Sequence, residues 1–160
     1  MSIDPAEFRR VLGHFASGVT VVTARDPDSE RPIGLTVSAF ASLSLDPTLV
    51  LICVEQGADS HDYIARSRHF AVNMLDEHGE LLARRFASDD ADGRFEGVAH
   101  RVRATGAPVL DDALAWVDCT LHECYHGGDH TIYVGEVVAA DARDGGPLLF
   151  YRGGYARLVP

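Results

Sequence analysis

The hydrophobic residues near the start of the chain recur at helical spacing. A helix is predicted over residues 5–17, with Asp4 as N-cap, Pro5 at the first helical position and Gly18 as the stop. Its hydrophobic residues follow the i, i+3, i+4, i+7 pattern of a single face: Phe8, Val11, Leu12 and Phe15. This apolar face predicts that the helix packs against another surface.

After Gly18 the pattern becomes that of β-strands. Runs of β-branched and apolar residues alternate with turn sequences such as Asp26-Pro27 and Asp46-Pro47. The run Leu49–Val54 lacks polar alternation, which is typical of a strand covered on both faces. The predicted strands span residues 19–23, 33–40, 49–54, 69–75, 100–105, 114–125, 131–140 and 148–158.

The spacing of these strands predicts the fold class. Two further short helices are expected over residues 60–67 and 77–87, and the acidic stretch 88–98 is expected to form a loop. No βαβ alternation and no G-x-G-x-x-G motif occurs, so a nucleotide would not bind in the Rossmann manner. We predict a mainly β protein, an antiparallel barrel with a few flanking helices, in a single domain over residues 1–160.

Composition and charge narrow the class of partner. The 160 residues are 46% hydrophobic and 24% charged, as expected for a globular protein. The net charge of −10 argues against binding to nucleic acid or to an anionic membrane. Neither a leader sequence nor an apolar run of about 20 residues is visible. The three cysteines, at 53, 119 and 124, have no framework spacing, so we expect reduced thiols and a cytoplasmic location.

A series of hydroxyl residues runs along the second predicted strand and the segment after it. In an extended segment these side chains would point one way: Thr36, Ser38, Ser42 and Ser44. Such a row beside backbone N–H groups can bind a phosphate or the edge of a polar heterocycle. The same pattern also fits the exposed face of an ordinary strand, and the residues alone leave both interpretations open.

Histidines gather near the predicted hairpin turn Gly127-Gly128-Asp129. His122, Cys124 and His126 would share one strand face, where consecutive ligands splay too far apart for a tight metal site, so no metal is expected. His130 lies at the turn itself, a position where functional residues often occur.

No nucleophile motif is present, and the sequence leaves the role of the arginines open. Cys53 lies in an apolar strand, where an inert thiol is expected. Arg84, Arg85 and Arg152 are expected to be structural unless the fold brings them to the hydroxyl row. A protein without its own reactive group fits a reaction in which a cofactor supplies the chemistry.

Four segments in this order resemble the flavin reductase-like family, the short-chain reductase components of two-component aromatic monooxygenases. The resemblance is co-linear from about Phe8 to Leu158 and so covers nearly the whole chain. The segments are residues 17–23 (SGVTVVT), 34–47 (GLTVSAFASLSLDP), 85–87 (RFA) and 128–137 (GDHTIYVGEV).

The resemblance implies an FMN-binding split β-barrel, a homodimer and a flavin near the subunit interface. It also implies a flavin contact for Thr36, Val37, Ser38, Ala39, Ser42, Cys53, Val54, Glu55, Ser60, Arg85, Phe86 and Ala87. By the same resemblance, His130 positions the nicotinamide of NAD(P)H, and Tyr155 helps to cover the site.

The activity implied is NAD(P)H-dependent hydride transfer to flavin N5, with reduced flavin supplied to a separate monooxygenase. Whether the flavin is FMN or FAD, and the donor NADH or NADPH, is left open. Two alternative functions are compatible with the same barrel fold: a non-catalytic flavin carrier and an oxidase of the pyridoxamine-phosphate type. The Gly128-Asp129-His130 segment favours the reductase over both.

Overall fold

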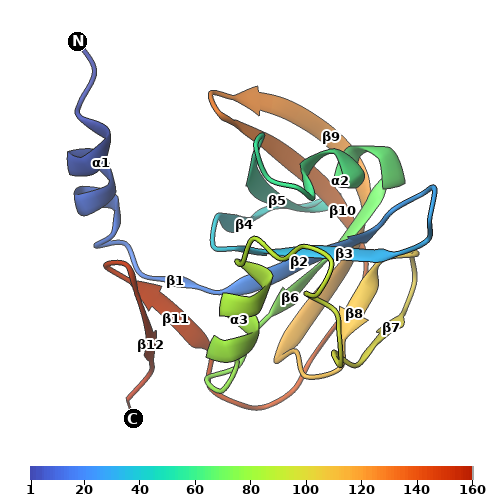
Figure 1. The fold of residues 1–160 in the computed structure, drawn as a ribbon. Helices are drawn as coiled ribbons and strands as arrows, with labels where there is room; N and C mark the ends of the chain where they lie inside the picture. Colours follow the sequence, from blue (N-terminus) through green and yellow to red (C-terminus); the bar gives the residue numbers. More distant parts are fainter. Residues whose placement is uncertain (160) are drawn as a thin grey trace.

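Seven strands form one antiparallel sheet in the computed structural model, which describes residues 1–159 (Figure 1). In spatial order they are β3 (Pro32–Val37), β2 (Thr20–Arg25), β6 (His69–Met74), β9 (Ala115–Gly127), β10 (His130–Ala142), β5 (Thr48–Glu55) and β4 (Phe40–Leu45). The mainly antiparallel β class predicted from the sequence is confirmed.

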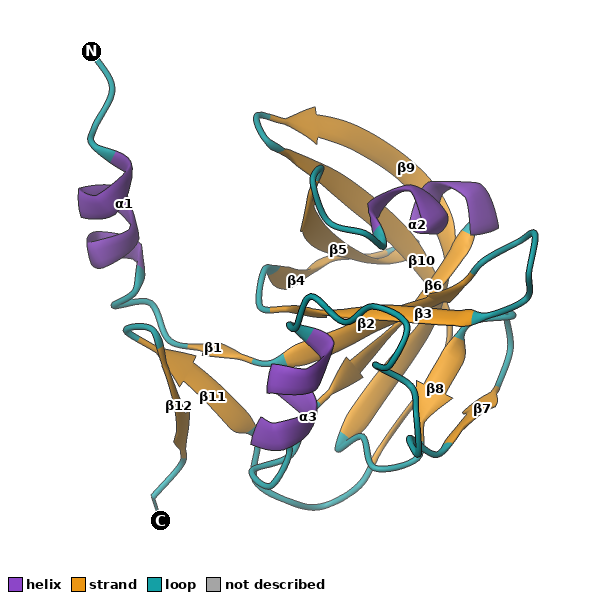
Figure 2. Ribbon diagram, in the orientation of Figure 1, coloured by secondary structure: helices purple, strands orange, loops and turns teal. Residues whose placement is uncertain are grey.

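Two smaller sheets and three helices complete the fold of residues 1–159 (Figure 2). One sheet contains β1 (Ser17–Gly18), β11 (Leu148–Tyr151) and β12 (Gly154–Arg157), and the other contains β7 (His100–Val102) and β8 (Pro108–Leu110). The helices are α1 (Pro5–Leu12), α2 (His61–Ser67) and α3 (Glu80–Phe86). None of the helices within residues 1–159 is long and apolar enough to cross a membrane.

The two edge strands of the large sheet are neighbours in the sequence. Only Ser38 and Ala39 separate the end of β3 from the start of β4, although five strands lie between them in the sheet order. The Cys53 N–H donates to the Ala39 carbonyl at 3.0 Å, which ties this junction to β5. The single strand predicted over 33–40 is therefore wrong, because the chain leaves one sheet edge and joins the other at this point.

The core lies on both faces of the central strands. One cluster includes Val22, Ile52, Phe70 and Tyr133, each no more than 1% exposed, together with Ile64 of α2. A second cluster includes Phe86 of α3, which is fully buried. Burying a side chain of this size contributes about 1.5–3 kcal/mol, so α2 and α3 are held mainly by these contacts.

The first helix begins as predicted but ends early. The Asp4 carboxylate accepts hydrogen bonds from the N–H groups of Ala6 and Glu7, at 2.9 and 3.2 Å. The helix ends at Leu12 with Gly13 as its C-cap. The predicted end at Ser17 is wrong, because Ser17 pairs with Phe150 in the small sheet. No residue of α1 is buried, so its apolar face has no partner within the described chain.

The last predicted strand is in fact a hairpin. Residues 148–158 form β11 and β12, joined at Arg152 and Gly153, whose φ values are 49° and 80°. The sequence pattern also misses β8, a three-residue strand that pairs with β7. Such short pairings depend on the neighbouring strand more than on local propensity.

Candidate functional site

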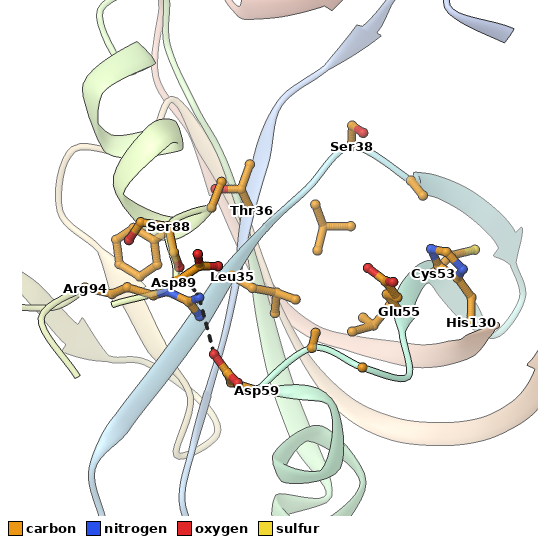
Figure 3. A pocket seen from close by; sticks show the side chains of 17 residues that line it. Leu35, Thr36, Ser38, Cys53, Glu55, Asp59, Ser88, Asp89, Arg94 and His130 are labelled. Atoms are coloured by element: carbon orange, nitrogen blue, oxygen red, sulfur yellow. Dashed lines mark hydrogen bonds and ion pairs between the residues drawn. The ribbon is translucent and has the colours of Figure 1, made fainter. Parts of the chain in front are cut away.

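A pocket of about 470 Å³ opens beside the junction between β3 and β4 (Figure 3). Its walls come from the end of β3, the end of β5 and the following turn, the segment after α3, and the start of β10. The lining residues are Leu35, Thr36, Val37, Ser38, Ala39, Cys53, Val54, Glu55, Gly57, Ala58, Asp59, Phe86, Ala87, Ser88, Asp89, Arg94 and His130.

Strand register explains why most of the predicted residues meet here. β10 pairs with β5 so that His130 lies opposite Glu55 and Ile132 lies opposite Cys53. The bond from Cys53 to Ala39 then brings the β3–β4 junction to the same place. The predicted residues that line this pocket are Thr36, Val37, Ser38, Ala39, Cys53, Val54, Glu55, Phe86, Ala87 and His130.

Four predicted residues lie outside the pocket. Ser42 is exposed on β4, opposite Val50, and Ser60 is buried just before α2. Arg85 donates from Nη2 to the Gly93 carbonyl at 2.8 Å. Tyr155 lies in the three-stranded sheet, with the Arg84 guanidinium 4.9 Å from its ring centroid. None of the four lines the pocket in the described chain, and their implied contacts stay predictions.

The predicted row of hydroxyl side chains is not continuous. The break after Val37 and a register shift between Ser42 and Ser44 place these residues on different parts of the fold. The Thr36 hydroxyl donates to the Ala83 carbonyl in α3 at 2.6 Å, so this side chain also fixes the helix to the sheet. The expectation of one aligned row is wrong, because it assumed a single extended strand.

Arg94 is the main pocket residue that the sequence reasoning missed. Its side chain is only 9% exposed, and it donates from Nη1 to the Gly34 carbonyl at 2.9 Å and from Nη2 to the Ser88 carbonyl at 2.5 Å. Its Nε is buried without a hydrogen-bond partner in the described chain. Nothing in the acidic loop 88–98 marks this arginine as buried, because its two acceptors are backbone carbonyls.

The charges around the pocket are mostly negative. Glu55, Asp59 and Asp89 line it beside a single arginine, Arg94. Figure 3 shows Asp59 on the same side of the pocket as Arg94, and the two groups are 3.8 Å apart. Because a phosphate carries about two negative charges, the three carboxylates oppose its binding and only Arg94 favours it.

His130 faces the pocket with one nitrogen already engaged. Its Nδ1 lies 2.7 Å from Asp129 Oδ1, and its side chain is 40% exposed. The hydrogen bond from His130 holds the pKa of the Asp129 carboxyl below its ordinary value. A neutral ring that donates from Nδ1 leaves Nε2 as an acceptor, whereas the imidazolium would donate from both nitrogens.

The cysteine thiols and the histidines of β9 lie in different surroundings. Burial raises the pKa of the Cys53 thiol, which fits the inert role predicted for it. His122, Cys124 and His126 are exposed on β9. Across residues 1–159, no three His, Cys, Asp or Glu side chains lie close enough together to hold a metal ion.

The chain belongs to the flavin reductase like domain family, whose model matches residues 12–159. This confirms the resemblance seen in the sequence. The chain is 46% identical over 158 residues to the reductase component of 4-nitrophenol 4-monooxygenase/4-nitrocatechol 2-monooxygenase from Rhodococcus opacus, covering 99% of this chain and 83% of that protein. It is 41% identical over 156 residues to a flavin reductase from Pseudomonas putida, covering 96% and 90%.

A solved structure shares the whole fold. The NADH:FAD oxidoreductase from Streptomyces globisporus, in complex with NAD and FAD fragments, superposes with a TM-score of 0.91 at 39% identity. The match covers 100% of this chain and 98% of that one.

Proposed function

We propose that this chain is an NAD(P)H:flavin oxidoreductase that reduces FMN or FAD and supplies the reduced flavin to a separate monooxygenase. The observation that carries the proposal is the pocket, which gathers residues 36–39, 53–55, 86–87 and 130 in a member of this family. The relatives named as flavin reductases and as a monooxygenase reductase component support the activity and the acceptor.

The pocket residues fit a flavin. A volume of about 470 Å³ falls within the usual range for a small-molecule site. Leu35, Ala39 and Ala87 offer accessible apolar surface for a planar ring system, while Ser38 adds a hydroxyl. The Arg94 guanidinium lines the pocket as a cationic donor suited to an anionic or carbonyl oxygen, and its Nε has no hydrogen-bond partner within residues 1–159.

The protein contributes binding and orientation more than chemistry. A bound flavin would supply the reaction, because it accepts a hydride at N5 from the nicotinamide. The β3–β4 junction holds the flavin plane and excludes water from it, and His130 orients the nicotinamide from another wall of the pocket. Asp129 fixes the His130 ring, so this orientation exists before the donor binds.

The two alternative activities receive less support. A flavin carrier or an oxidase of the pyridoxamine-phosphate type would use the same kind of pocket. The relatives matched across almost the whole chain are named as reductases, and a structure with NAD and FAD fragments shares the fold. These names favour the reductase.

The protein acts as a homodimer in this proposal. The apolar face of α1 has no partner within residues 1–159, with Phe8 at 52% and Leu12 at 50% exposure, and Phe15 just after the helix is 82% exposed. Figure 1 shows α1 standing away from the large sheet. A second copy of the chain would cover this face. The cytoplasmic location expected from the sequence stays a prediction.

Flavin-dependent oxidation of NADH by the purified protein tests the activity. We expect absorbance at 340 nm to fall when protein, NADH and free FMN or FAD are mixed, and to stay constant when flavin or protein is omitted. NADPH in place of NADH measures the donor preference. Flavin binding without NADH oxidation would support the carrier instead and contradict the reductase.

A further inference from the structure

Asp59 is the carboxylate that faces the buried arginine of the pocket. Its Oδ2 lies 3.8 Å from Arg94 Nη2, and no other carboxylate within residues 1–159 comes within 4 Å of that guanidinium. The other partners of Arg94 are the carbonyl oxygens of Gly34 and Ser88, which neutralise no charge. Arg94 is thus fixed in place, and Asp59 is the anion next to it.

The Asp59 side chain contributes few contacts to the fold. Its side chain is 62% exposed and accepts no hydrogen bond from any residue in the described part of the chain. Removing this carboxylate breaks no hydrogen bond of the described chain and loses only the 3.8 Å ion pair with Arg94, the one arginine that lines the pocket within residues 1–159. The main effect of the removal is therefore on what Arg94 can bind.

Flavin nucleotides bring a phosphate, and a guanidinium is the group that proteins use most often to bind one. At this pocket the phosphate would meet Arg94 together with the negative charges of Asp59, Asp89 and Glu55. Asp59 neutralises part of the arginine charge and also repels the phosphate directly, because like charges at this range oppose each other.

We propose that Asp59 weakens the binding of flavin phosphates by competing for Arg94, so that FMN and FAD exchange readily instead of remaining bound. The inference rests on the proposed function, since it concerns the same pocket. The Asp59 carboxylate thus disfavours tight binding of the flavins that carry a phosphate. A reductase whose product must leave for another protein requires such release.

Equilibrium binding of FMN and riboflavin to the wild type and to Asp59→Asn tests this role. Riboflavin has the same ring and ribityl chain but no phosphate, so its binding should change less than twofold. The dissociation constant for FMN should fall about threefold to tenfold, since an exposed carboxylate is removed from beside a doubly charged group. Quenching of flavin fluorescence measures both constants without any turnover.

Asp144→Asn is the matched control. Asp144 is exposed, lies outside the pocket and makes no side-chain hydrogen bond or ion pair in the described chain, so this variant changes the net charge equally. It should leave the ratio of FMN to riboflavin affinity unchanged. The dissociation rate of FMN, followed by stopped flow, should also fall in Asp59→Asn and not in Asp144→Asn.

The outcomes separate this inference from the proposed function. Selective tightening of FMN in Asp59→Asn supports the role of Asp59. Equal effects on FMN and riboflavin, or no effect on either, would overturn it while leaving the reductase proposal intact. A wild-type protein that binds neither flavin would overturn both proposals.

Discussion

At the scale of single residues, the polar side chains around the pocket are held by other parts of the chain before any ligand arrives. His130 is held by Asp129, Thr36 by the Ala83 carbonyl and Arg94 by the carbonyls of Gly34 and Ser88. Groups held in this way lose little conformational freedom when a ligand binds. The pocket is therefore largely preformed, and each contact can be tested by one substitution.

Replacing His130 by Ala should raise the KM for NADH about fivefold and leave the flavin dissociation constant within twofold of wild type. The expected size corresponds to the loss of one hydrogen bond of about 1 kcal/mol. Steady-state kinetics and flavin titration measure the two effects separately. His126→Ala, an exposed neighbour on β9, is the control. Equal weakening of both ligands would contradict a role at the nicotinamide.

The three thiols should differ strongly in reactivity. Burial raises the pKa of Cys119 to about 12, and burial also raises the pKa of Cys53, whereas Cys124 is exposed. Since the thiolate is the reactive form, one thiol per folded chain should react rapidly with a disulfide reagent at pH 8. Cys124→Ser should abolish this fast phase. A fast phase that survives in this variant would show that the buried thiols are accessible.

At the scale of elements, the β9–β10 hairpin carries His130 to the pocket, and Gly135 lies where its pairing shifts register. A register shift separates Val134 from Gly135 in the pairing of β10 with β9. A Cβ on Gly135 would lie 2.6 Å from Phe70 Cζ and 2.8 Å from Cys119 Cβ. Both neighbours are fully buried, so neither has room to move away.

Gly135→Ala should therefore lower the free energy of unfolding by about 1–3 kcal/mol, the usual cost of overpacking a core. Chemical denaturation measures the change. Gly18→Ala is the matched control, because a Cβ there would meet no described atom within 4 Å. If both variants were equally stable, the close approach of β10 to Phe70 would not constrain the hairpin.

At the scale of the whole molecule, the unpartnered helix α1 predicts the oligomeric state. Replacing Phe8 and Leu12 together by Ser should convert a dimer into a monomer, since about half of each side chain is exposed on one subunit. Light scattering after gel filtration gives the mass. Arg9→Ser, on the same helix, should leave the dimer intact. A wild-type monomer would contradict the homodimer.

The stability of the molecule should also fall in mild acid through His69. Burial lowers the pKa of His69 below its ordinary value, an effect that the nearby Asp118 carboxylate opposes. The unfolded chain, with an ordinary pKa of about 6.5, then binds more protons than the folded chain just below that pH. The stability contributed by the neutral His69 side chain is therefore fully present above about pH 6.5. It is lost as the pH falls from there toward the lowered pKa of His69.

Thermal unfolding between pH 7.5 and pH 5.5 measures this effect. His69→Gln should lose less stability over that interval than the wild type, because the titrating group is gone. His78→Gln, whose side chain is 76% exposed in the folded chain, is the control and should follow the wild type. Parallel loss in all three proteins would rule out His69 as the source.

Local patterns in the sequence account for much of the fold. The Asp4 cap, the β-branched run of β2 and the turn at Gly128 each depend on neighbouring residues, and each was predicted near its observed position. The family resemblance then named most of the residues that line the pocket, and the family is confirmed. Short-range chemistry and family motifs were enough for these features.

Only the tertiary structure decided which residues meet. The sheet order separates β3 from β4 although they are consecutive in the chain, so Thr36 lines the pocket and Ser42 does not. The same long-range pairing places Asp59 beside Arg94, 35 residues further along the sequence. The sequence by itself determined the elements, their class and the family, because these depend on local propensity and pattern. The meeting of distant charges depends on strand order, which no local pattern encodes.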